Sequence, residues 1–182
     1  GLRLLKKGDV VGNAVYSIRS EDRLLESSLL EEESIPQAFR STYVLTFDEV
    51  PALKALLVRI YEVDFAKRGG LNLACKRLQR TYGESDPEDK LIDLMIAFEA
   101  LFMKGEKAGA SSGQVVAVAC STLLGKNDED RDKIRSLLTK AYSIRNQIVH
   151  GSVYQPRIVN QIVEDDLEDI VSEVEDYLRE ST

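Results

Sequence analysis

Residues 87–104 constrain the fold most, because they read as one helix that is apolar on nearly all sides. Asp86 is a suitable N-cap and Pro87 suits the first helical position, so the start of this helix is clearly marked. A helix without a polar face has to be covered by other helices. The sequence therefore predicts a bundle with this helix at its centre, and its apolar positions are Leu91, Ile92, Leu94, Met95, Ile96, Phe98, Leu101 and Phe102.

Helical spacing of apolar residues continues on both sides of this segment. Gly69-Gly70 is expected to end the helix before it, and Asn127 is expected to cap a long helix after it. The expected fold class is a mainly helical bundle over residues 48–182. Its other helices are expected at residues 48–67, 71–82, 114–124 and 127–151, and in a last segment from Val163 to Leu178.

Residues 1–47 lack a helical period and are expected to form an arm or the end of a preceding β-rich unit. Residues 10–19 and 41–47 are rich in valine, tyrosine and threonine, which favours short strands. The acidic stretch at residues 21–33 is expected to interrupt them. The chain starts with Gly1 and not with methionine, so we expect a fragment of a longer protein or a tag remnant.

The charge distribution bears on the partners of the chain. A formal net charge of -7 argues against a protein that simply coats nucleic acid. Residues 131–157 nevertheless carry six basic residues against Asp132 alone, and residues 67–82 carry five and no acid, whereas residues 158–182 are strongly acidic. The basic segments are expected either to flank a cleft that binds an anion or to be solvated helix faces.

Cysteine usage and hydropathy indicate the compartment. The chain has two cysteines without C-x-x-C spacing, so we expect free thiols in a reducing compartment and a cytoplasmic location. It contains no apolar run of about 18 residues and no secretory start, so no membrane association is expected.

The helix near the C-terminal end carries an arginine in an unusual place. Arg145 follows a stripe of apolar residues at steps of three and four, so it is expected to face the core. A buried arginine needs a partner, because an unpaired buried charge is costly. Asp93 and Glu99 of the apolar helix are the two acids on offer, although both could instead reach solvent at the bundle edge or satisfy backbone groups.

His150 is the single histidine of the chain and ends the same helix. A chain with one histidine has few other groups for proton transfer near neutral pH. Asn146 precedes it by four residues, so the two side chains share a helix face. The alternative is that His150 only complements the dipole at the helix C-terminus.

The end of this helix resembles the signature of HEPN domains, which are helical bundles with an R-x(4–6)-H motif and a polar residue after the arginine. The matching string is YSIRNQIVHG at residues 142–151. The pattern KLIDLMIAFEALF at residues 90–102 and the string LLG at residues 123–125 are similar to the ApeA-like branch. The resemblance covers about residues 48–180.

The resemblance implies a metal-independent endoribonuclease that cleaves single-stranded RNA through the 2′-hydroxyl, in a toxin, stress or phage-defence system. It implies no cofactor and no metal, and a homodimer in which the motifs of two protomers meet. By position, Arg145 would bind the phosphate, Asn146 would support it and His150 would transfer the proton. Glu99 and Asp93 would orient Arg145.

A two-fold interface also agrees with the chemistry, because one histidine per chain supplies one proton-transfer group and a second copy supplies another. Candidate RNA-binding residues are Lys140, Tyr142, Tyr154 and Arg157, although the two tyrosines could equally be core or rim aromatics. Two other functions stay open. The bundle could be a non-catalytic dimerisation or nucleotide-binding module, or a toxin-like enzyme silenced by an antitoxin or by a regulatory N-terminal domain.

Overall fold

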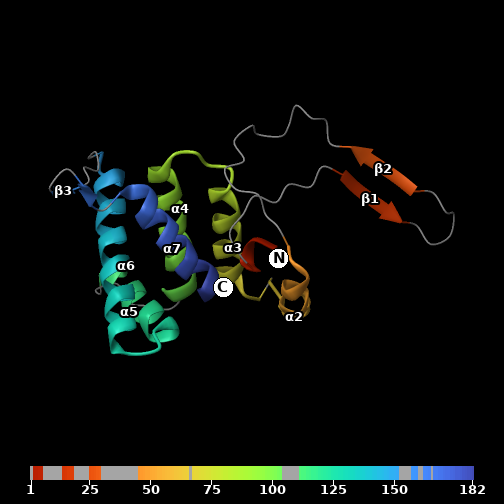
Figure 1. Cartoon of the computed structure of the whole chain (residues 1–182), viewed down its shortest axis with the longest axis horizontal. Helices are drawn as coiled ribbons and strands as arrows, with labels where there is room; N and C mark the ends of the chain where they lie inside the picture. The colour runs from red at the N-terminus through yellow and green to blue at the C-terminus, as the bar shows by residue number, and fades with distance from the viewer. Residues whose placement is uncertain are drawn as a thin grey trace.

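The computed structural model describes residues 2–5, 14–18, 25–29, 45–65, 67–103, 111–151, 157–159, 162–164 and 166–182. Helices α3 to α7 pack around one hydrophobic core, so the prediction of a mainly helical bundle is confirmed (Figure 1). These helices are α3 (Gly69–Thr81), α4 (Pro87–Phe102), α5 (Ser112–Leu124), α6 (Asp128–Val149) and α7 (Leu167–Ser181).

Helix α4 occupies the centre, as its all-round apolar sequence predicts. It contacts each of α3, α5, α6 and α7. Its start is also as expected, because the Asp86 carboxylate accepts a hydrogen bond of 2.8 Å from the backbone N–H of Glu88, with Pro87 in the first turn. The buried residues of α4 are Leu91, Asp93, Leu94, Met95, Ala97 and Phe98.

Helices α6 and α7 both begin at a side-chain cap. The Asn127 amide oxygen accepts from the backbone N–H of Asp130 at 2.8 Å, which confirms the expected start of α6. Asp166 caps α7, so the last helix starts later than its apolar spacing suggests. Val163 belongs instead to strand β4 (Ile162–Glu164), which pairs antiparallel with β3 (Arg157–Val159), a hairpin that the sequence analysis missed.

Helix α2 (Val50–Glu62) ends earlier than expected, and the prediction that Gly69-Gly70 ends it is wrong. The two glycines begin α3. A Cβ atom at Gly70 would lie 2.3 Å from the carbonyl oxygen of Ala100, so the glycine permits α3 to approach α4 closely.

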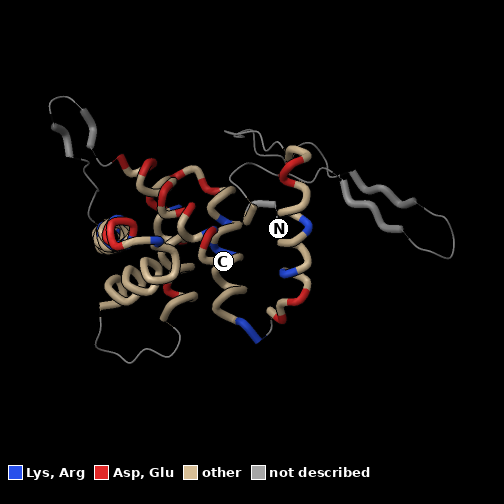
Figure 2. The backbone as a smooth tube through the Cα atoms, turned by 60° about the horizontal axis from the view of Figure 1, so that its bottom comes forward, with Lys and Arg blue, Asp and Glu red and all other residues tan. Residues whose placement is uncertain are grey.

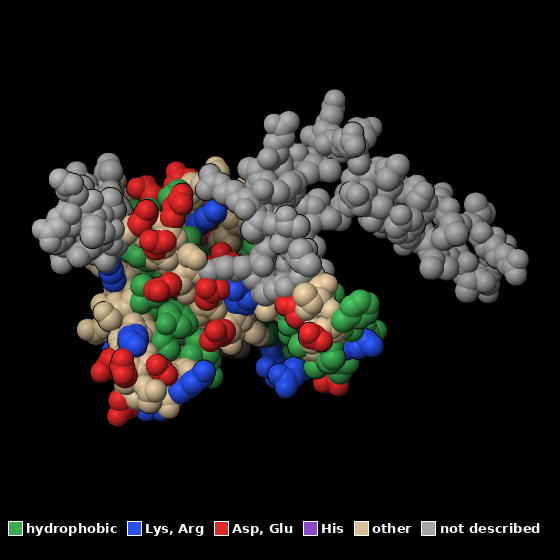
Figure 3. Space-filling view, in the orientation of Figure 1, with side chains coloured by type: hydrophobic (Ala, Val, Ile, Leu, Met, Phe, Trp, Pro, Cys, Tyr) green, Lys and Arg blue, Asp and Glu red, His purple; other side chains and the backbone are tan. Residues whose placement is uncertain are grey.

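Helix α2 lies at the edge of the bundle in both views (Figures 1 and 2). None of its residues is buried. Hydrophobic side chains are exposed over it (Figure 3), notably those of Leu57, Val58 and Tyr61, together with Phe47 just before it. The apolar spacing of this helix therefore predicts its existence but not its burial.

Short elements precede α2. Strand β1 (Ala14–Ile18) falls within the expected strand and pairs antiparallel with β2 (Leu25–Leu29). The acidic stretch at residues 21–33 thus contains a strand, whereas it was expected only to interrupt strands.

The strand expected at residues 41–47 is wrong over its described part. Residues 41–44 lie outside the described residues, and Phe47 begins a 3₁₀ turn, η2 (Phe47–Glu49). The Glu49 carboxylate accepts a hydrogen bond of 2.8 Å from the backbone N–H of Thr46, a capping interaction that turns the chain towards α2. Helix α1 (Leu2–Leu5) contributes Leu4 to the rim of the core. The domain boundary near residue 47 stays a prediction.

Candidate functional site

Arg145 lies in the last third of α6, one to three turns after Ile134, Leu138 and Ala141, which are buried. The arginine continues this stripe at the edge of the core, and its side chain is 21% exposed. Its position follows from helical spacing, because steps of three and four residues keep a side chain on one face. A largely covered guanidinium requires interactions with neighbouring helices.

Glu99 of α4 is the acid beside Arg145. The distance between Glu99 Oε2 and Arg145 Nη2 is 4.0 Å, at the outer limit of an ion pair. The other carboxylate oxygen, Oε1, accepts a hydrogen bond of 2.9 Å from the hydroxyl of Tyr142. The Tyr142 ring in turn lies under the guanidinium, 5.6 Å from Cζ to the ring centroid, within the range of a cation–π contact.

Gly113 of α5 packs closely against the ring of Tyr142. A Cβ atom at residue 113 would lie 2.7 Å from Cγ and Cδ1 of the tyrosine ring. Any other residue at this position would therefore displace the ring or the helix. Glu99, Gly113 and Tyr142 thus bring α4, α5 and α6 together around Arg145.

Asn146 and His150 complete the expected motif on α6. The Asn146 amide oxygen accepts a hydrogen bond of 3.1 Å from Arg145 Nη1. His150 is the C-cap of the helix, and its imidazole is exposed and has no hydrogen bond or ion pair with the described residues. Gly151 follows with a φ of 79°, a left-handed conformation that ends the helix directly after His150.

Asp93 does not orient Arg145, so that expectation is corrected. It is buried, and its two carboxylate oxygens bind arginines of α3, at 2.6 Å from Arg77 Nη1 and 3.1 Å from Arg80 Nε. Asp93 and Glu99 are six residues apart, which separates them by about 120° around a helix. The two acids of α4 consequently face different neighbouring helices.

Over their described residues, the two basic segments do not flank one cleft within a single chain. Helix α3 lies on the other side of α4 from α6 (Figure 1). Much of their charge is also paired. Arg77 and Arg80 bind Asp93, and the first turns of α6 hold the pairs Arg131–Asp128, Lys133–Glu129 and Arg135–Asp132.

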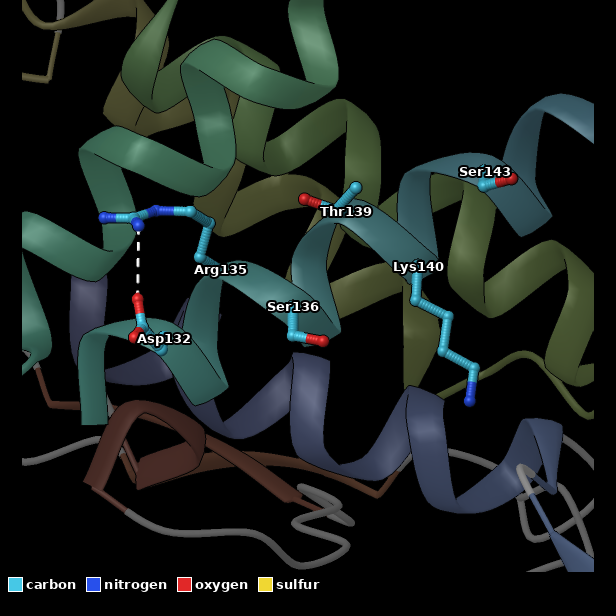
Figure 4. Close-up of a pocket in the computed structure, with 6 residues that line it drawn as sticks. All are labelled: Asp132, Arg135, Ser136, Thr139, Lys140 and Ser143. Atoms are coloured by element: carbon cyan, nitrogen blue, oxygen red, sulfur yellow. Dashed lines mark hydrogen bonds and ion pairs between the residues drawn. The ribbon is translucent and has the colours of Figure 1, made fainter. Parts of the chain in front are cut away.

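The outer face of α6 carries a shallow groove (Figure 4). In the close-up, Arg135 reaches towards Asp132 at one end, and Lys140 extends from the other end. The floor between them consists of hydroxyl side chains. The lining residues are Asp132, Arg135, Ser136, Thr139, Lys140 and Ser143.

The four candidate RNA-binding residues do not form one described surface. Lys140 lies in this groove and is half-buried. Tyr142 is half-buried and engaged with Glu99, so its ring is not presented for stacking on a base. Tyr154 lies outside the described residues, and Arg157 is described only as part of strand β3.

Two residues have a role in this cluster that the sequence does not predict, and they are Tyr142 and Gly113. The sequence predicts Tyr142 either as an RNA-stacking residue or as a core or rim aromatic, although its position three residues before Arg145 puts both on one face. Gly113 lies just before the helix expected at residues 114–124, and nothing in its local sequence signals close packing against another helix. Its role appears only when α5 and α6 are placed side by side.

Three further observations concern metal ligands, thiols and membrane-spanning helices. Over the described part of the chain, no cluster of three or more histidine, cysteine, aspartate or glutamate residues is arranged to hold a metal ion. Cys75 and Cys120 are free, as expected, and burial raises the pKa of both thiols. Within the same residues, no helix has the length and apolar character required to cross a bilayer.

Comparisons with protein families, with curated proteins and with solved structures find no match for this chain.

Proposed function

We propose that this chain is a metal-independent endoribonuclease of the HEPN type, similar to the ApeA-like branch, which cleaves single-stranded RNA as a homodimer. Arg145 binds the scissile phosphate, Asn146 supports the arginine, and His150 transfers a proton. The reaction needs no cofactor. We place the protein in the cytoplasm, in a toxin, stress or phage-defence system with an antitoxin or a regulatory N-terminal domain as a further partner.

One observation carries the proposal: the Arg145 guanidinium has N–H donors without an acceptor among the described residues, and the exposed His150 ends the same helix five residues later. Of its five N–H groups, only one has a hydrogen-bond acceptor among the described residues, the Asn146 oxygen. Its buried Nε has none. A planar guanidinium with free donors is suited to a phosphate, which accepts two parallel hydrogen bonds.

The proposed chemistry assigns one proton transfer to each of two histidines. One imidazole removes the proton of the 2′-hydroxyl, and the 2′-oxygen attacks the phosphorus. The bond from phosphorus to the 5′-oxygen breaks, and the second imidazole protonates that oxygen. The products are a 2′,3′-cyclic phosphate and a 5′-hydroxyl, and Arg145 stabilises the charge that develops on the phosphorane.

A second function is favoured by a different observation. The Glu99 carboxylate gives Arg145 a partner inside the chain, and the arginine side chain is largely covered. An arginine bound in this way suits a non-catalytic module that dimerises or binds a nucleotide. The exposed His150 would then serve only the helix terminus.

The test is cleavage of a single-stranded RNA in EDTA by the wild type, Arg145→Ala and His150→Ala. The control is Arg59→Ala, since Arg59 is exposed on α2, away from the site. We expect cyclic-phosphate ends from the wild type and the control, and no cleavage by the two site variants with their helical content retained. A wild type that is dimeric by sedimentation and leaves RNA intact would overturn the nuclease and leave the module, and a requirement for magnesium would contradict this mechanism.

A further inference from the structure

The hydroxyl of Tyr142 and the guanidinium of Arg145 both approach the carboxylate of Glu99. We propose that Tyr142 is a positioning residue, which binds Glu99 and keeps it from closing on Arg145, so that the arginine stays oriented and free to bind a phosphate. This inference rests on the proposed function. It replaces a stacking role for Tyr142 with a role inside the protein.

The distances show how the carboxylate is shared. Glu99 Oε1 accepts the Tyr142 hydroxyl at 2.9 Å, whereas Oε2 stays 4.0 Å from Arg145 Nη2. A direct charge-assisted contact between a guanidinium and a carboxylate is shorter, at about 2.7–2.9 Å. The tyrosine therefore holds the carboxylate at a distance from which its charge still attracts the arginine but occupies none of its donors.

The partners of the Arg145 N–H groups are consistent with this arrangement. Among the described residues, the buried Nε has no hydrogen-bond acceptor, which is costly for a charged group. Asn146 fixes Nη1 from one direction, and the Tyr142 ring supports the guanidinium face. The guanidinium is thus held in orientation by contacts that leave most of its N–H groups without an acceptor among the described residues.

The position of the tyrosine ring is fixed as well. Gly113 lies so close to Cγ and Cδ1 of Tyr142 that even a methyl group would not fit between them. The ring is wedged between α5 and the guanidinium, with its hydroxyl directed to α4. It cannot swing out to stack on a base without leaving Glu99, and a positioning role follows from this geometry.

The first test is structural and does not depend on cleavage. Tyr142→Phe preserves the ring and removes only the hydroxyl, so Glu99 is released. We expect the distance between Glu99 and Arg145 to shorten to hydrogen-bond length in a crystal structure. Rotation of the Arg145 guanidinium about its Nε–Cζ bond should slow, measured by NMR on ¹⁵N-arginine-labelled protein with Arg145→Lys for assignment. Tyr61→Phe, at a fully exposed ring on α2, is the control. An unchanged distance and rotation in Tyr142→Phe would overturn the inference.

The second test is a double-mutant cycle with Glu99→Gln, which removes the charge that closes on Arg145. Tyr142→Phe alone should lower kcat/KM for RNA about tenfold, since a tightened pair competes with the phosphate for the arginine donors. In the Glu99→Gln background the same change should have little further effect. Equal losses in both backgrounds would overturn the inference. A wild type without cleavage would refute the proposed function, while the structural test would still decide the role of Tyr142.

Discussion

Oδ1 of Asp93 lies 2.6 Å from Nη1 of Arg77, and this ion pair joins the central helix α4 to α3. The carboxylate is buried, and its second oxygen binds Arg80, whose side chain is 65% exposed. Arg77 and Arg80 bind the same acid, but the side chain of Arg77 is more covered than that of Arg80. They can therefore be compared directly.

Arg77→Ala should destabilise the protein more than Arg80→Ala. Removal of the covered partner leaves a buried carboxylate poorly paired, which we expect to cost about 2–3 kcal/mol. Removal of the exposed partner should cost less than about 1 kcal/mol, because water screens that pair. Urea unfolding of both variants measures the difference. Equal losses would show that Asp93 depends on both arginines alike.

Gly113→Ala should destabilise the bundle and disturb Arg145 at the same time. The added methyl group would meet the Tyr142 ring at 2.7 Å, so α5 and α6 must separate or the ring must move. We expect a loss of roughly 1–3 kcal/mol, the usual range for overpacking. Gly83→Ala is the matched control, since its nearest neighbour, the carbonyl oxygen of Arg80, is at an ordinary 3.7 Å. Thermal unfolding monitored by circular dichroism compares them, and equal stability of the two variants would contradict the close packing at Gly113.

Gly151→Ala tests the backbone that ends α6 behind His150. There is open space around this position, so the cost is conformational: a residue with a Cβ atom in the left-handed region loses about 1 kcal/mol or slightly more. Gly69→Ala has the same open space without a positive φ and should be neutral or slightly stabilising. Denaturant midpoints measure both changes. We also expect Gly151→Ala to lower RNA cleavage, because the helix end that presents His150 is strained. No difference between the two variants would argue against the left-handed helix end.

Stability should fall at alkaline pH because of the buried thiol of Cys120. Burial raises its pKa from 9.0 to about 11, against a weaker opposing effect of the hydrogen bond with Ser181. Between these two values the unfolded chain loses the proton while the folded chain keeps it, so the free energy of unfolding decreases as pH rises. Below pH 9 this contribution is fully present.

The measurement is urea unfolding between pH 8 and about 11. Cys120→Ala should flatten the decline by roughly 2 kcal/mol over this range. Tyr82 adds a similar decline above pH 10, since burial and the neighbouring Glu175 raise its pKa to about 12. Tyr82→Phe should remove that second part, and an unchanged slope in Cys120→Ala would contradict the assignment to the thiol.

The sequence predicts α4, its central place and the side-chain caps of α4 and α6 correctly, because these depend on local chemistry. An apolar surface all round a helix requires cover, and Asp86 and Asn127 offer acceptors where the first N–H groups need them. The need of Arg145 for an acid is predictable for the same reason. Which acid it meets depends on the rotation of α4 against α6, and this is a property of tertiary packing.

The errors have physical causes of the same kind. A Gly-Gly pair suits the end of a helix, but Gly70 serves close contact with α4, which no local pattern signals. The excess of basic residues in 131–157 is misleading, because Arg131 and Lys133 pair with acids that lie just before this segment, from Asp128 onwards. The apolar spacing of α2 is satisfied without burial, since a helical period says nothing about whether a partner is present.

The central place of α4 has a consequence for motion. Because α3, α5, α6 and α7 all rest on it, we expect the amide hydrogens in its buried middle to exchange with solvent only when the whole bundle opens. Helix α2 has no buried residue and should open locally, at a much lower free energy. A single hydrogen-exchange experiment would thus measure the free energy of global unfolding at α4 and that of local opening at α2. The exchange rates of α4 would then report the overall stability of the chain.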